Sequence, residues 1–314
     1  MTRKILTLNM KRKIVPKPVE KLVKAVFHQD PQKRFLNGVA INPDQLIQLE
    51  LGSKQLSMRA MDLLTPIGMG QRGLIVAPPG SGKTTILKHI CQSVGEAYPE
   101  IKLYALLIDE RPEEVTDFKR NVPAQVFASS TDENYDHHLR VTNDLLKIAR
   151  KEAGEGHNVM IVIDSLTRLT RVHNANQKSS GRTMSGGIDA RAMEIPRKLF
   201  GTARNIENGG SITILATILI DTGSRMDQVI FEEFKGTGNM EIVLSREAAN
   251  LRVFPAFDIA KSSTRREELL LNSKDIDKVR LIRRGLTSLK PVDGARKLVE
   301  LLDKYPTNIE LLNQ

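Results

Sequence analysis

A glycine-rich loop at residues 77–85 carries the most specific chemistry in the sequence. The loop reads APPGSGKTT, follows an apolar run and opens an amphipathic segment, as a Walker A phosphate-binding loop requires. Gly80 and Gly82 let the backbone approach phosphate closely, at what would be a helix N-terminus. Lys83 would reach the β- and γ-phosphates of ATP, and Thr84 would hold Mg²⁺. The expected nucleotide contacts are Pro79, Gly80, Ser81, Gly82, Lys83, Thr84 and Thr85.

The strict Walker A pattern begins with glycine, whereas this loop begins with Ala77. The alternative interpretation is a Gly/Pro-rich turn that contains Gly-Lys-Thr by chance. The flanking segments and the acidic residues described next favour the phosphate site.

Two further apolar runs end in carboxylates. Residues 159–163 lead into Asp164, which is the Walker B arrangement and would place a second ligand in the Mg²⁺ shell beside Thr84. Residues 103–108 lead into Asp109 and Glu110. Hydrolysis needs a carboxylate that orients the attacking water, and we expect Glu110 to do this, with Asp109 as the next candidate.

These side chains need a scaffold that brings strand ends together. Near-continuous apolar runs alternate with helix-like segments, which predicts an α/β fold with a mainly parallel central sheet covered on both faces. Residues 292–312 have the apolar spacing of a helical tail. The expected strands are 73–77, 103–108, 125–129, 159–163 and 212–218, and the expected helices are 83–94, 113–120, 135–152 and 190–205.

Composition excludes several classes of protein. The 314 residues are 40% hydrophobic and 27% charged, and they include one cysteine, so neither a disulfide scaffold nor a cysteine-rich metal site is expected. No apolar run is long enough for a membrane span, and the N-terminus does not have the form of a secretory signal, so we expect a cytoplasmic protein without a membrane partner. The net charge is +10, of which +8 lies in residues 1–34. That basic arm indicates either a polyanionic partner or an incidental solubilising tail.

Long collinear blocks of the sequence resemble the ATPase domain of the Rho family of transcription termination factors. They include GQRGLIVAPPGSGKTT, LLIDERPEEVTDF, VIDSLTRLTR, FGTARNIENGGSITILAT, LIDTGSRMDQVIFEEFKGTGNMEIVLSR, RVFPAFDI and STRREELLL. The resemblance implies a RecA-like P-loop ATPase that forms a homohexameric ring, translocates single-stranded RNA and binds ATP with Mg²⁺ at subunit interfaces.

The resemblance also assigns roles to individual residues. It places Arg111 at the phosphates, Arg265 as an arginine finger for the neighbouring subunit's ATP, Arg252 as a second interface arginine and Phe254 against adenine. A trans arginine suits the chemistry, because the transition state of phosphoryl transfer spreads negative charge over the γ-phosphate oxygens. Without the resemblance, a solvated helix start explains Arg265 equally well.

Two polar segments are candidates for RNA contact. Residues 176–187 are rich in Gly, Ser and cations, and residues 221–227 follow an apolar strand. Both could offer donors to phosphate or the 2′-hydroxyl, and the family pattern would place both in the pore of the ring. Taken alone, either segment would more simply be a surface connection. The expected RNA contacts are Arg182, Thr183, Gly186 and Arg225.

The family's N-terminal RNA-binding domain, usually of more than a hundred residues, has no counterpart in the 55 residues before the matching blocks. We therefore expect a basic N-terminal extension over residues 1–55, partly disordered or helical, and an ATPase domain over residues 56–314. One alternative function is a truncated paralogue that binds RNA and nucleotide, or modulates a full-length Rho, without terminating transcription by itself. Another is a related ring ATPase that acts on protein or as a rotary motor. RNA polymerase or a full-length Rho is a further partner that the resemblance suggests.

Overall fold

The computed structural model describes residues 30–176 and 185–314. A nine-stranded sheet forms its centre, with the path β11-β10-β4-β9-β7-β5-β6, and the six strands from β10 to β6 run parallel to one another. This confirms the expected α/β fold with a mainly parallel sheet. The strands are β1 Ala40–Ile41, β2 Leu46–Ile47, β3 Ile67–Gly68, β4 Arg72–Ala77, β5 Lys102–Glu110, β6 Gln125–Ser130, β7 Asn158–Asp164, β8 Arg204–Ile206, β9 Ser211–Leu219, β10 Met240–Val243 and β11 Ser263–Thr264.

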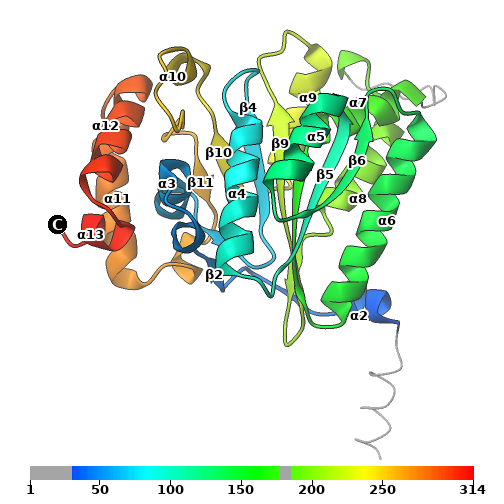
Figure 1. Ribbon diagram of the computed structural model, residues 1–314, viewed down its shortest axis with the longest axis horizontal. Helices are drawn as coiled ribbons and strands as arrows, with labels where there is room; N and C mark the ends of the chain where they lie inside the picture. Colours follow the sequence, from blue (N-terminus) through cyan, green and yellow to red (C-terminus); the bar gives the residue numbers. More distant parts are fainter. Residues whose placement is uncertain (1–29, 177–184) are drawn as a thin grey trace, which may run out of the picture.

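Helices cover both faces of this sheet (Figure 1). The α-helices are α2 Pro31–Asn37, α3 Leu56–Leu64, α4 Lys83–Ala97, α5 Pro112–Asn121, α6 Tyr135–Gly154, α7 Leu166–Asn176, α8 Glu194–Phe200, α9 Arg225–Lys235, α10 Arg246–Asn250, α11 Ser273–Thr287, α12 Pro291–Lys304 and α13 Asn308–Leu312. The 3₁₀ turns are η1 Leu49–Gly52, η2 Ser185–Gly187, η3 Ala190–Met193 and η4 Glu267–Leu269. Within the described residues, no helix is both long and apolar enough to cross a bilayer.

The core has one layer on each face of the sheet. In β4, Ile75 and Ala77 face the layer built with α3, α4, α5, α11 and α12, whereas Leu74 and Val76 face the layer built with α2, α6, α7, α8 and α9. Both sets of side chains are buried because a parallel sheet carries helices on both sides. This explains why the strands are apolar without alternation.

Residues 30–55, which the sequence assigned to the N-terminal extension, pack on this body. Phe35 of α2 is 1% exposed, and β1 pairs with β8. The contact between α2 and α6 is so close that a Cβ atom on Gly154 would lie 1.8 Å from the carbonyl oxygen of Pro31. The arm over residues 1–29 lies outside the described residues.

The single helix expected over residues 190–205 is wrong. The segment forms η3, then α8, then strand β8, which pairs with both β1 and β9. Pro196 lacks an amide hydrogen and is tolerated only in the first turn of a helix, so α8 begins two residues before it. Gly201 caps its C-terminus. Apolar residues recur at helical spacing across the whole segment, and this pattern hid both the start of α8 near Pro196 and its end at Gly201.

Candidate nucleotide-binding and catalytic site

The loop between β4 and α4 has the backbone that a phosphate cradle needs. Gly80 and Gly82 have φ angles of 76° and 99°, in the left-handed region that favours glycine. Gly82 is the N-cap of α4, so the first amide groups of a 15-residue helix open toward the loop. Ser81 is buried and closes the turn, because its hydroxyl donates to the carbonyl oxygen of Pro78 at 2.7 Å.

Lys83 is the centre of a polar cluster at the carboxyl edge of the sheet. Its Nζ donates to both carboxylate oxygens of Asp164, at 2.8 and 2.7 Å, and lies 3.7 Å from Oε2 of Glu110. The hydroxyl of Thr84 donates to Asp164 at 3.2 Å, and that of Thr217 donates to it at 2.8 Å. The structure thus brings together Lys83, Thr84, Asp164 and Glu110 from three separate segments, as the sequence predicted.

This cluster fits Mg²⁺ as well as phosphate. Mg²⁺ prefers oxygen ligands and usually takes only one or two from protein, with phosphate and water supplying the rest. The Thr84 hydroxyl and the Asp164 carboxylate are oxygen donors within 3.2 Å of each other beside the phosphate loop.

Glu110 is a buried carboxylate that lies between two cations. Its side chain is 2% exposed, its Oε1 faces Arg168 and its Oε2 faces Lys83. Burial raises its pKa to about 7, and the neighbouring charge of Asp164 adds to the rise, while Lys83 and Arg168 oppose it. A carboxyl group with that pKa, beside the phosphate loop, is suited to orienting and deprotonating a water molecule.

Arg168 is a site residue that sequence reasoning missed. Its Nη2 lies 2.9 Å from Oε1 of Glu110, and its Nη1 donates to the carbonyl oxygen of Asp109. The residue stands in the first turn of α7, four residues after Asp164. A helix that starts directly after a Walker B strand points its first turn at the same sheet edge, and this was the signal available in VIDSLTRLTR.

The other two predicted residues on this edge take less part in the cluster. Asp109 has a φ of 56° and contributes its carbonyl oxygen through the bond from Arg168. Arg111 is the exposed N-cap residue of α5, directly after Glu110 in the chain, and no ion pair of its side chain is found in the described part of the structure.

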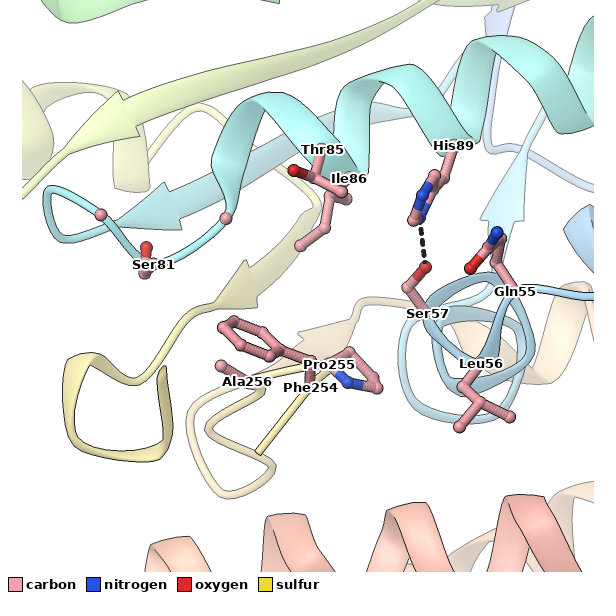
Figure 2. A pocket seen from close by; sticks show the side chains of 12 residues that line it. Gln55, Leu56, Ser57, Ser81, Thr85, Ile86, His89, Phe254, Pro255 and Ala256 are labelled. Atoms are coloured by element: carbon pink, nitrogen blue, oxygen red, sulfur yellow. Dashed lines mark hydrogen bonds between the residues drawn. The ribbon is translucent and has the colours of Figure 1, made fainter. Parts of the chain in front are cut away.

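A pocket of about 380 Å³ adjoins the phosphate loop and runs along α4 (Figure 2). Gly80 and Gly82 line its phosphate end, and the ring of Phe254, 45% exposed, lines its side. At the far end Ser57 and His89 form a hydrogen bond of 2.9 Å. Phe254 therefore lines the same pocket as the phosphate loop, although it is far from that loop in the chain.

Arg265 lies on the opposite edge of the sheet. Its amide donates to the carbonyl oxygen of Asn239, the residue before β10, and β10 begins beside Gly73 near the start of β4. The phosphate loop follows the other end of β4, so one subunit does not bring Arg265 to its own Lys83 cluster. Arg252 is exposed, has a φ of 58° and follows α10, two residues before Phe254.

The candidate RNA segments are described in part. Arg182 and Thr183 lie outside the described residues. Gly186 packs directly on α9: a Cβ atom there would lie 3.0 Å from the backbone of Arg225, so these two predicted residues are neighbours. Arg171 of α7 holds the start of α9 through an ion pair with Asp227, with 2.7 Å between Nε and Oδ1.

Fold and site together define a P-loop ATPase, and residues 57–264 match the model of the ATP synthase alpha/beta family, nucleotide-binding domain. The protein is an ATP-hydrolysing enzyme. It belongs to the family of transcription termination factor Rho.

The family assignment rests on long matches to curated relatives named transcription termination factor Rho. The relative from Streptobacillus moniliformis is 51% identical over 84% of this chain, and the chain spans 64% of that relative's length. The relative from Bacillus subtilis is 48% identical over 93% of the chain and 70% of its own length. Among solved structures, a prototypical ATPase from a bacterial type III secretion system is 25% identical, with a TM-score of 0.68 over 85% of this chain and 82% of that one.

Proposed function

We propose that this protein is an RNA-dependent ATPase that assembles into a homohexameric ring, moves along single-stranded RNA and acts in transcription termination in the cytoplasm. The names of the curated relatives support the process. The observation that supports assembly into a ring is that the residues of the proposed site lie in two separate groups. Lys83, Asp164 and Glu110 lie at the carboxyl edge of the sheet, whereas Arg265 lies exposed at the amino edge.

On the nucleotide side, the amide groups at the start of α4 and the Lys83 ammonium bind the β- and γ-phosphates. Thr84 and Asp164 hold Mg²⁺, which neutralises charge on the phosphates when bound. Glu110 orients the attacking water and accepts its proton, and Arg168 fixes the position of the Glu110 carboxylate through their 2.9 Å ion pair. Phe254 packs against the base.

Arg265 completes the site of the next subunit. A guanidinium that enters from a neighbour stabilises the charge on the γ-phosphate oxygens in the transition state. Arg252 and Arg111 join it at the interface and the phosphates, as the resemblance implies. Since one edge of each subunit meets the opposite edge of the next, the contact is heterologous, and such contacts form a ring when the rotation between neighbours closes.

RNA binds to the segments that contain Arg182, Thr183, Gly186 and Arg225. The contact between Gly186 and the backbone of Arg225 supports a joint surface. Cations there bind the RNA backbone without reading its sequence.

The test is ATP hydrolysis with and without single-stranded RNA, for the full chain and for Lys83→Ala. We expect RNA to stimulate the full chain strongly and Lys83→Ala to be inactive under both conditions. Stimulation by an unfolded polypeptide but not by RNA would favour a protein-directed ring ATPase and contradict the proposal. The relatives give no support to the alternative of a paralogue that only modulates a full-length Rho.

A further inference from the structure

The far end of the pocket in Figure 2 holds a polar pair to which the proposed mechanism gives no role. Ser57 stands in the first turn of α3 and is 7% exposed. Its Oγ lies 2.9 Å from Nδ1 of His89, on the face of α4 that also presents Thr85 and Ile86 to the pocket. A nucleotide whose phosphates lie at Gly82 and whose base packs on Phe254 would direct the edge of the base at this pair.

A serine hydroxyl has one hydrogen to donate and two lone pairs that accept. If Nδ1 of His89 accepts that hydrogen, Ser57 presents lone pairs alone to a ligand. No other described residue forms a hydrogen bond with Ser57 Oγ, so these lone pairs face the pocket unused. A base with an amino group at position 6 can donate a hydrogen bond to these lone pairs. A base with a carbonyl oxygen at that position places its own lone pairs against those of Ser57 Oγ, and the two repel each other.

The surroundings of His89 keep it neutral, and the tautomer that carries its hydrogen on Nε2 accepts the Ser57 hydrogen at Nδ1. Burial lowers its pKa. The other residues that line the pocket, from α3, the phosphate loop, α4 and the segment 254–256, carry no formal charge, so no carboxylate there favours an imidazolium.

We propose that the Ser57–His89 pair selects the nucleobase by its 6-substituent and favours an amino group over a carbonyl oxygen. The inference rests on the proposed function, because it requires the base to lie between Phe254 and α4. It makes Ser57 a specificity residue and His89 a positioning residue that acts through the Ser57 hydroxyl.

The experiment compares ATP with inosine triphosphate, because their bases differ only in the 6-substituent and the adjacent ring proton. We measure kcat and KM for both nucleotides, with saturating RNA, in the full chain and in the variants Ser57→Ala and His89→Ala. Gln92→Ala is the matched control, because Gln92 is an exposed polar residue on the same helix outside the pocket.

We expect the full chain and the control to favour ATP about tenfold in kcat/KM, mostly through KM, as one well-placed hydrogen bond against a repulsive contact would give. Ser57→Ala should raise the KM for ATP severalfold and lower that for inosine triphosphate, because it removes both the acceptor and the repulsive contact. His89→Ala frees the Ser57 hydrogen to face the ligand, so it should lower the KM for inosine triphosphate. Both variants should keep kcat for ATP within about twofold, which also shows that they fold.

A merely structural role for the pair would raise both KM values together and leave their ratio unchanged, and this result would overturn the inference. The same holds if the full chain does not distinguish the two nucleotides. Failure of the proposed function is seen separately, because RNA would then leave ATP hydrolysis by the full chain unstimulated.

Discussion

At the residue scale, the proposed chemistry depends on how the fold sets the charge of Glu110. A glutamate in water has a pKa near 4.3 and would be a weak base. Burial and the nearby Asp164 carboxylate raise the pKa of Glu110 to about 7, where proton acceptance is most useful at neutral pH. Lys83 and Arg168 oppose that rise in pKa, so a share of the Glu110 side chains is still ionised at neutral pH.

The first prediction concerns the pH dependence of hydrolysis. Glu110 must be ionised to accept a proton, so we expect the RNA-stimulated ATPase rate to fall as the pH decreases through about 7. The measurement is kcat at saturating ATP and RNA between pH 5.5 and 8.5. Glu113→Gln, which changes an exposed acid in the next helix, should keep this profile. A flat profile over this range would contradict the role of Glu110 as the base.

The second prediction concerns stability without nucleotide. Because the pKa of Glu110 is raised on folding, the folded state binds the proton more tightly than the unfolded chain, and stability is lost as the pH rises from 4.5 through about 7. Glu110→Gln stays neutral, so we expect its free energy of unfolding to exceed that of the wild type by about 2 kcal/mol more at pH 8 than at pH 5. Its ATPase rate should fall by about 10²–10⁴-fold. Denaturant unfolding at both pH values tests the first part, and a pH-independent difference would be inconsistent with a raised pKa.

At the element scale, α7 joins the two candidate sites. Its first turn places Arg168 against Glu110 and the Asp109 carbonyl, and its next turn places Arg171 against Asp227 at the start of α9. Asp227 is 1% exposed and also accepts a hydrogen bond of 2.5 Å from Thr222. A displacement of the 221–227 segment by RNA would therefore act on a helix that also contacts Glu110, the proposed catalytic carboxylate.

The third prediction follows from this helix. Arg171→Ala should reduce the stimulation of ATPase activity by RNA severalfold while leaving the rate without RNA within about twofold, because it cuts the link and spares the Lys83 cluster. Arg197→Ala is the matched control, since the exposed Arg197 forms an ion pair with Glu233 further along α9. Equal stimulation in the two variants would show that the Arg171–Asp227 contact does not transmit the signal.

Four of the five strands expected from apolar runs, β4, β5, β7 and β9, carry the site, and they were predictable because a parallel strand buried on both faces is apolar throughout. Strand β10 was not expected: it has only four residues, and Glu241 interrupts its apolar run. The Lys83, Asp164 and Glu110 cluster could be predicted because Glu110 and Asp164 end apolar strands and Lys83 stands just after the glycine-rich loop. Arg168 could not be singled out in the same way, because an arginine in a first helical turn looks like any solvated cation until the helix is oriented.

At the scale of the whole molecule, the two halves of the proposed catalytic site belong to opposite edges of the sheet. A subunit with an intact Lys83 can then use the Arg265 of a neighbour even when its own is missing. A complete catalytic site would then form only where two subunits meet.

The fourth prediction uses that property. Lys83→Ala and Arg265→Ala should each be inactive alone, whereas mixed rings should recover part of the ATPase activity. Recovery occurs where an Arg265→Ala subunit supplies the phosphate loop and a Lys83→Ala subunit supplies the arginine. The measurement is the ATPase rate after the two variants are mixed and reassembled, with Lys83→Ala mixed with itself as control. Mixed oligomers without activity would place Arg265 outside the neighbour's site.

The contact between α2 and α6 has a consequence for mutational tolerance. A Cβ atom on Gly154 would enter the space of the Pro31 carbonyl group, and backbone cannot be displaced as a flexible side chain can. In a library scored only for folded protein, Gly154 should therefore accept substitution as poorly as a core phenylalanine, although it bears no side chain and takes no part in hydrolysis. The contact between Gly154 and the Pro31 carbonyl group would constrain the segment before the phosphate loop. Sequence changes in α2 and α6 should therefore concentrate at other positions of these helices.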